Sequence, residues 1–371
     1  MCKGEKMKTN INFHGSDIEK VAKHYNIDKK DIRNYSGNVN PLGLSPYLEK
    51  KLIENIHLVT SYPDPDYTEL KANISKYTNS DVQHVLLGNG STELIAHYID
   101  YVNPKVTLIV GPTYSEYEKK AKTLHSEVHY YPLSEENDFI VDIDKLIDHC
   151  TERVDLVVLC NPNNPTASFI ESEKLLPLFD HCKANATQIL IDETYMDFVD
   201  DSLSVSALSL VKIYDNCIVL RGFSKFFAAP GLRLGYGVTS DMNCHRSLEL
   251  QRHHWSINSL AAFAGKELMA DKYFISNSIE FIHDERERIT AILSSEPKIK
   301  LYPANANFFF LKLLDKDHSS ARLFEHLIKK GIMIRDSSSF PFLHGEFIRF
   351  CILSKADNDL LINGLIEFLN A

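Results

Sequence analysis

Short apolar runs alternate with longer amphipathic stretches between residues 84 and 240 of the chain. The runs are rich in Val, Leu and Ile, which is typical of strands buried on both faces of a mainly parallel sheet. They lie at residues 84–88, 105–110, 127–131, 154–160, 188–193, 216–222 and 234–238. The pattern therefore predicts an α/β fold, in which helices cover both faces of a mainly parallel, seven-stranded sheet.

The pattern changes after residue 240. Long helical patterns are followed by a tail of mixed strand and helix, and these segments lie at 259–271, 277–295, 307–314, 322–336 and 346–353. This change predicts a second, smaller α+β domain at the C-terminal end. We therefore expect an N-terminal arm at 1–45, a large domain at 46–275 and a small C-terminal domain at 276–371.

Composition narrows the classes of function. The 371 residues are 44% hydrophobic and 24% charged, as in ordinary globular proteins, and the net charge of −10 gives no reason to expect nucleic acid or an anionic membrane as a partner. The seven cysteines are scattered without a CxxC pair, which argues against a disulfide framework or a zinc site. No leader-like or membrane-spanning apolar segment is visible. We expect a reduced, cytoplasmic protein that acts on small molecules and holds no metal.

Polar and aromatic residues follow five of the predicted strands, where ligands collect in sheets of this kind. They are GNGSTE at 88–93, Tyr114 in GPTYSEY, the CNPNNPTA segment at 160–167, DETY at 192–195 and the segment RGFSKFFAAPGLRLGYG at 221–237. Each motif alone is weak, because an Asn-Gly step is usually a turn. Since the carboxyl ends of parallel strands meet at one edge of a sheet, the five together predict one pocket.

Lys225 is the candidate reactive group of that pocket. It follows an apolar strand and is flanked by phenylalanines, so burial should lower its pKa and leave a neutral, nucleophilic amine. Taken alone, Lys225 could equally extend from a strand end into solvent. Its neighbours favour the first interpretation, because they supply donors that bind a phosphate: Gly90, Ser91 and Thr92 at a predicted helix start, with Ser224 and Arg233.

An amine beside a phosphate site indicates pyridoxal 5'-phosphate (PLP), which forms a Schiff base with lysine. Asp192 would then keep the pyridine nitrogen protonated, so that the ring can accept electrons. Tyr195 and Asn164 could hydrogen-bond the ring hydroxyl, and Tyr114 could stack on the ring face.

Several motifs resemble the signatures of the class I/II aminotransferases of PLP fold type I, in the same order along the chain: NPNNPT, IDETY and SKFFAAPGLRLGY. Over nearly its whole length the chain resembles the branch that contains histidinol-phosphate aminotransferases and L-threonine-O-3-phosphate decarboxylases, with NVNPLG, SYPDP, GNGSTELI and GIMIRD fitting both. The resemblance implies the roles given above for the pocket residues. It also implies a homodimer with a shared site, in which Tyr62 reaches the cofactor phosphate of a second subunit, and it places Arg349 at the substrate carboxylate.

The resemblance leaves two reactions open. The arm at 13–43 and the segment IRDSSSFPFLHGEFIRF are nearer to the decarboxylase, so we expect CO₂ release from a small phosphorylated amino acid such as L-threonine-O-3-phosphate. The alternative is a histidinol-phosphate or related aminotransferase with 2-oxoglutarate as amino acceptor. Both readings need cationic or polar groups for the substrate, and the candidates are Arg349, Arg335, Asn40 and His14.

The chain departs from the family pattern at three positions. Gly222 stands where the superfamily often has serine or threonine, Ala167 replaces a glycine, and Leu353 stands where the decarboxylase pattern tends to carry a basic residue. The last departure bears on the substrate and not on the cofactor.

Three other classes fit the sequence less well. A nicotinamide-dependent oxidoreductase would need the third glycine of GxGxxG, which GNGSTE lacks. A metal hydrolase built on the histidines of CHRSLELQRHHW would need an HExxH motif. A non-catalytic PLP-binding regulator would retain the pocket, but we expect an appended DNA-binding segment in such a protein.

Overall fold

The computed structural model describes residues 17–371, and His14, a predicted substrate residue, lies outside that range. The large sheet has the predicted seven strands, and their order is β2-β8-β7-β6-β5-β3-β4. The strands are β2 (Val85–Gly88), β3 (Val106–Gly111), β4 (Glu127–Pro132), β5 (Leu156–Cys160), β6 (Gln188–Asp192), β7 (Cys217–Gly222) and β8 (Gly235–Val238). Pairing is parallel from β4 through β7, whereas β8 runs antiparallel to both of its neighbours. The predicted fold class is confirmed.

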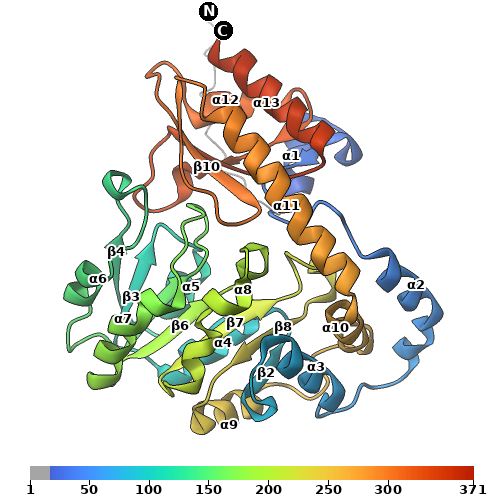
Figure 1. The fold of residues 1–371 in the computed structure, drawn as a ribbon, viewed down its shortest axis with the longest axis vertical. Helices are drawn as coiled ribbons and strands as arrows, with labels where there is room; N and C mark the ends of the chain where they lie inside the picture. Colours follow the sequence, from blue (N-terminus) through green and yellow to red (C-terminus); the bar gives the residue numbers. More distant parts are fainter. Residues whose placement is uncertain (1–16) are drawn as a thin grey trace, which may run out of the picture.

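Helices cover both faces of this sheet (Figure 1). Alternation along β7 shows why: Ile218 and Leu220 pack in one core with α4 and α9, whereas Cys217 and Val219 pack in the other. The helices of this part are α2 (Pro46–Glu54), α3 (Thr68–Thr78), α4 (Ser91–Val102), α5 (Glu116–Thr123), α6 (Ile143–His149), α7 (Ser172–Ala184), α8 (Ser202–Val205), α9 (Met242–Gln251) and α10 (Ser259–Ala270).

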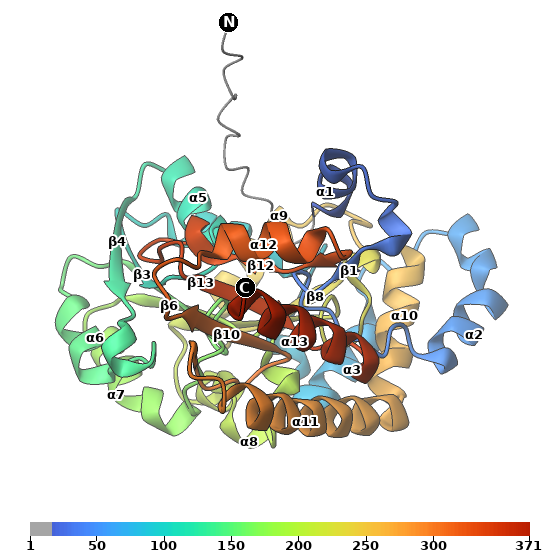
Figure 2. The same ribbon diagram turned by 90° about the horizontal axis from the view of Figure 1, so that it is seen from above.

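A second, antiparallel sheet follows in the order β12-β13-β10-β9, which matches the predicted α+β tail. It comprises β9 (Ile299–Leu301), β10 (Phe308–Leu313), β12 (Arg335–Asp336) and β13 (Phe347–Cys351), and helices α12 (Ser320–Ile328) and α13 (Lys355–Leu369) lie beside it. Near the N-terminus, α1 (Ile18–Tyr25) precedes β1 (Arg33–Asn34), which pairs in parallel with β11 (Ile332–Met333). Figure 2 shows α1 on the same side as these C-terminal elements.

Helix α11 (Lys272–Leu293) connects the two parts of the molecule as one continuous element (Figure 1). The predicted boundary at 275/276 therefore falls inside its first turn, and the three-part division of the chain stays a prediction. Within residues 17–371, no helix combines the length and the apolar character that crossing a membrane requires.

Candidate active site

A cavity of about 710 Å³ opens at the carboxyl edge of the large sheet, between that sheet and strands β12 and β13. Most of the residues predicted from the sequence line it together: Ser91, Thr92, Tyr114, Asn164, Asp192, Tyr195, Ser224, Lys225, Arg233, Arg335 and Arg349. The strand-end motifs converge because parallel strands present their carboxyl ends to the same edge. Arg335 and Arg349 reach the cavity from the other sheet, where they lie directly opposite one another on β12 and β13.

Lys225 lies on the segment after β7 with its amine in the cavity. Its Nζ donates to the Gly37 carbonyl oxygen at 2.7 Å, so the amine is held by a neutral acceptor. Burial, together with the positive charges of Arg349 and Arg233, lowers the pKa of Lys225 to about 8. Near neutral pH a far larger fraction of this amine is therefore unprotonated and nucleophilic than in an exposed lysine.

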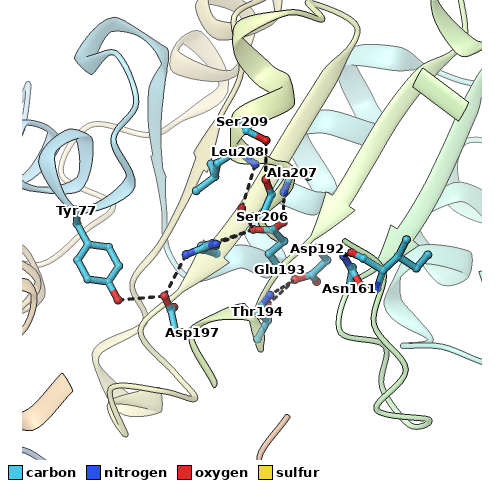
Figure 3. A network of polar contacts seen from close by, with 12 residues as sticks. Tyr77, Asn161, Asp192, Glu193, Thr194, Asp197, Ser206, Ala207, Leu208 and Ser209 are labelled. Atoms are coloured by element: carbon cyan, nitrogen blue, oxygen red, sulfur yellow. Dashed lines mark hydrogen bonds and ion pairs between the residues drawn. The ribbon is translucent and has the colours of Figure 1, made fainter. Parts of the chain in front are cut away.

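Asp192 ends β6 and is 4% exposed. Its Oδ2 accepts from the Tyr117 hydroxyl at 2.7 Å, and its Oδ1 accepts from the backbone N–H and hydroxyl of Thr194 at 3.0 and 2.5 Å (Figure 3 draws the Thr194 contacts). Burial raises the pKa of Asp192, while these hydrogen bonds favour its charged form. A carboxylate held in this way is suited to bind a cationic ring nitrogen.

Tyr117 and Thr194 were not singled out from the sequence, although both lie in motifs that were. Tyr117 lies in the first turn of α5, Tyr114 lies just before that helix, and their rings meet edge-on at 5.5 Å between centroids. The available signal was that Tyr117 belongs to the same GPTYSEY motif as Tyr114. The buried hydroxyl of Tyr195 accepts from Asn38 Nδ2 at 3.3 Å, another contact that the sequence did not indicate.

The N-terminus of α4 forms a cradle for an anion. Ser91 and Thr92 begin this helix, and the first amides of a helix have no acceptor within it. Gly90 precedes them with φ +83°, and a Cβ added there would lie 2.3 Å from Arg233 Nη2. A side chain at Gly90 would therefore be strained and would displace the Arg233 guanidinium group, which lines the cavity together with Ser91, Thr92 and Ser224. These residues fit the phosphate of PLP.

A second cationic group comes from the small sheet. Arg349 is 5% exposed, and it donates to Asn164 Oδ1 and, from Nη2, to the Ser36 carbonyl oxygen at 2.5 Å. Its buried Nε has no hydrogen-bond partner among the residues that the structure describes. Arg335 donates to Ser339 Oγ at 2.6 Å, and burial together with the charge of Arg349 lowers its pKa to about 10. An anionic ligand would relieve the cost of burying both guanidinium groups.

Besides Gly90, which stands beside the cavity against Arg233, two predicted residues of the described chain do not line the cavity. Asn40 is 2% exposed, and its amide group donates to the Phe226 carbonyl oxygen and to Ser278 Oγ, each at 2.8 Å. Asn40 thus supports the segment that carries Lys225, and its side chain does not face the space where a substrate would lie. Tyr62 is 79% exposed and packs on Trp255, with ring centroids 4.6 Å apart.

Comparison with known proteins agrees with this geometry. Residues 31–365 match the sequence profile described as "Aminotransferase class I and II". The chain belongs to this family. The resemblance drawn from the motifs is therefore confirmed, and with it membership in a family of PLP-dependent enzymes.

Individual relatives of this aminotransferase-family protein cover almost its whole length. The threonine-phosphate decarboxylase of Salmonella typhimurium strain LT2 is 30% identical over 356 residues, which are 96% of this chain and 96% of the relative. The crystal structure of the histidinol-phosphate aminotransferase from Clostridium acetobutylicum is 31% identical with a TM-score of 0.85, covering 91% of this chain and 98% of that one. The fold is also that of the histidinol-phosphate aminotransferase from Sinorhizobium meliloti in complex with pyridoxal-5'-phosphate, with a TM-score of 0.83, 19% identity and coverage of 95% and 94%.

The structure locates the three departures from the family pattern. Leu353 does not line the cavity and packs, partly buried, against the main hydrophobic core. Ala167 has φ 56°, so it adopts the left-handed conformation that a glycine takes without strain. An added Cβ at Gly222 would meet Leu234 O at an ordinary 3.6 Å, so the backbone there has room for a side chain.

Proposed function

We propose that this protein binds PLP in the described cavity, with the phosphate on the α4 cradle and Arg233. Lys225 is the residue that links covalently to the cofactor, because its amine is buried, held by Gly37 and loses its proton near pH 8, well below the range of an exposed lysine. Asp192 binds the pyridine nitrogen, and Tyr195 with Asn164 binds the ring hydroxyl. Tyr114 stacks on the ring.

PLP supplies an electron sink for the bond that breaks at the substrate Cα. The protein's own residues decide which bond that is. Arg349 binds the substrate carboxylate through donors that Asn164 and Ser36 hold in one orientation, and Lys225 lies where it can give a proton to Cα or take one from it. With PLP bound, the orientation in which Arg349 would hold the substrate carboxylate would decide whether CO₂ or the Cα proton is lost, and Lys225 would take up or return that proton.

The substrate that the site supports best is a small phosphorylated amino acid of the L-threonine-O-3-phosphate type, which loses CO₂. The observation that carries this choice is the pair of buried arginines, Arg335 and Arg349, opposite each other on β12 and β13. Such a substrate has two anionic groups besides the PLP phosphate, which Arg233 already serves, and two further guanidinium groups match them. Leu353 does not line the cavity, and the lining already supplies two guanidinium groups without a basic residue at that position.

A histidinol-phosphate or related aminotransferase is the second candidate, because the same arginines also suit the two carboxylates of an amino donor or acceptor. The similarity to the Clostridium enzyme supports it.

The cofactor assignment is tested by colour and trapping. The purified protein should have a visible absorption band that borohydride abolishes, leaving a pyridoxyl group on Lys225. A pyridoxyl group on another lysine, or no band after PLP is added, would refute the assignment.

The reaction is tested in one vessel. Each phosphorylated substrate is supplied with and without 2-oxoglutarate, and CO₂ and glutamate are measured. CO₂ from L-threonine-O-3-phosphate that does not depend on the oxo acid supports the decarboxylase. Glutamate formed with histidinol phosphate, without CO₂ from threonine phosphate, would favour the aminotransferase and leave the PLP assignment standing.

We also propose a homodimer in which Tyr62 reaches the phosphate cradle of the partner. The support is an exposed apolar surface on α2 and the segment after it, at the margin of the molecule (Figure 1). Ile53, Ile56, Val59 and Tyr62 are 69%, 57%, 62% and 79% exposed there. A surface of several large apolar side chains on a single protomer is typical of a protein interface.

A further inference from the structure

A buried ion-pair network lies directly beside the proposed PLP site without lining it (Figure 3). Arg221, at the end of β7, is fully buried. Its Nε and Nη2 are each 2.9 Å from Glu193 Oε2, and its Nη1 is 3.1 Å from Asp197 Oδ1. Both carboxylates are at most 3% exposed. One guanidinium group therefore holds two carboxylates that come from the segment after β6.

The network fixes the residue next to Asp192. Besides Arg221, Glu193 accepts from the Ser206 hydroxyl at 2.6 Å and from the Ala207 backbone N–H at 2.8 Å. Its own N–H donates to the Leu220 carbonyl oxygen at 2.8 Å, which ties the end of β6 to β7. Asp192 is the last residue of β6 and lines the cavity, whereas Glu193 does not, so fixing Glu193 restrains the backbone that carries the Asp192 carboxylate.

The same network supports the segment that carries Lys225. The Tyr77 hydroxyl of α3 donates to Asp197 Oδ1 at 3.0 Å, and the Tyr77 ring packs against Phe227 at 6.0 Å between centroids. Phe198, next to Asp197, meets Phe226 edge-on at 5.2 Å. Phe226 and Phe227 follow Lys225 directly in the chain and are fully buried. The network thus contacts the segment that carries Asp192 and the segment that carries Lys225.

Stability alone is a poor reason for this arrangement. Burying charged groups carries a large desolvation cost, and well-packed apolar residues are often as stabilising as a buried ion pair. A guanidinium group that donates to several fixed acceptors also fixes the direction of each contact, which apolar packing does not do. That property is useful where two groups must be held at a set separation.

We propose that Arg221, Glu193, Asp197 and Tyr77 are positioning residues, which hold the Lys225 amine and the Asp192 carboxylate at the separation that PLP requires. This inference rests on the proposed function. It assigns no contact with substrate or cofactor to the four residues, and their effect passes through Glu193 to Asp192 and through the aromatic pairs to Lys225.

The test compares two tyrosines that each donate to one aspartate. Tyr77→Phe removes the bond to Asp197, and the control Tyr214→Phe removes a bond of 2.6 Å from the 8%-exposed Tyr214 to Asp180, outside the cavity lining. Asp197→Asn is a further variant that removes charge and keeps shape. The PLP-loaded full-length proteins are compared by melting temperature, by the dissociation constant for PLP and by the visible circular dichroism per bound PLP, which reports how rigidly the cofactor is oriented.

Both tyrosine variants should lower the melting temperature, because each loses one partly buried hydrogen bond to an aspartate, and Tyr77→Phe should lower it more because Asp197 is buried whereas Asp180 is exposed. Only Tyr77→Phe and Asp197→Asn should also weaken PLP binding, by roughly threefold to tenfold, and reduce the dichroism per bound cofactor. The inference is overturned if these two variants bind and orient PLP as the wild type does, or if Tyr214→Phe changes both readouts equally. If Asp197→Asn does not fold, Tyr77→Phe alone decides. A wild-type protein that binds no PLP would instead refute the proposed function.

Discussion

Replacing Gly90 by alanine should weaken the phosphate cradle. The structure allows the resulting loss of PLP affinity to be estimated. Gly90 has φ +83° and ψ 160°, a region that glycine adopts almost alone, so alanine there costs about 1–3 kcal/mol of folding free energy. The new Cβ would also lie 2.3 Å from Arg233 Nη2, so the guanidinium group must move away from the helix start. Losing a charge-assisted hydrogen bond to the PLP phosphate costs about 1.5–3 kcal/mol. We therefore expect PLP affinity to fall by roughly tenfold to a hundredfold.

Alanine variants at two other glycines serve as controls, which separate the effect of backbone strain from the effect of displacing Arg233. Gly43 also has a positive φ, +72°, but an added Cβ there meets nothing within 4 Å. Gly231, two residues before Arg233, has no positive φ and an equally open Cβ position. Gly43→Ala should lower the melting temperature and leave PLP affinity unchanged, and Gly231→Ala should change neither.

The assay is a titration of each cofactor-free protein with PLP, followed through the visible band, together with thermal melting. Wild-type affinity in Gly90→Ala would refute the reasoning, because it would mean that Arg233 does not serve the phosphate. An affinity loss of equal size in Gly43→Ala would show that backbone strain, and not Arg233, is responsible.

Three further predictions concern chemistry and assembly. Asp192→Asn keeps the shape of the side chain but not its charge, so turnover should fall by roughly a hundredfold to a thousandfold while PLP still binds, and near-normal turnover would mean that another group protonates the ring. Burial lowers the pKa of Lys225 to about 8, so the rate at which PLP attaches to the cofactor-free protein should rise with pH as the amine loses its proton, with a midpoint near pH 8. A midpoint near the pKa of free lysine would contradict the burial of this amine. Tyr62→Phe should weaken PLP retention and leave Lys225 reactive, whereas a monomer in sedimentation that retains PLP normally would refute the shared site.

Much of the site was predictable because its residues follow strands. An apolar run that ends in a polar motif predicts both the strand and the edge where the motif lies, so Asp192, Asn164 and Lys225 could be placed in one pocket without a structure. Gly90 before a helix start carries similar local information about an anion site. The direction of β8, antiparallel to its neighbours, was not visible in its apolar pattern, because burial on both faces looks the same in either direction.

The remaining features depend on contacts between distant parts of the chain. Asn164 and Arg349 are 185 residues apart, and no periodicity in either segment indicates that one donates to the other. Asn40 belongs to a motif of the site, yet packing turns its side chain toward Phe226 and Ser278 and away from the cavity. Sequence by itself determined which residue types gather at the sheet edge, since local hydrophobic patterning places strand ends. Only the tertiary structure decided which donor meets which acceptor there, because close packing and the satisfaction of buried polar groups are properties of the whole fold.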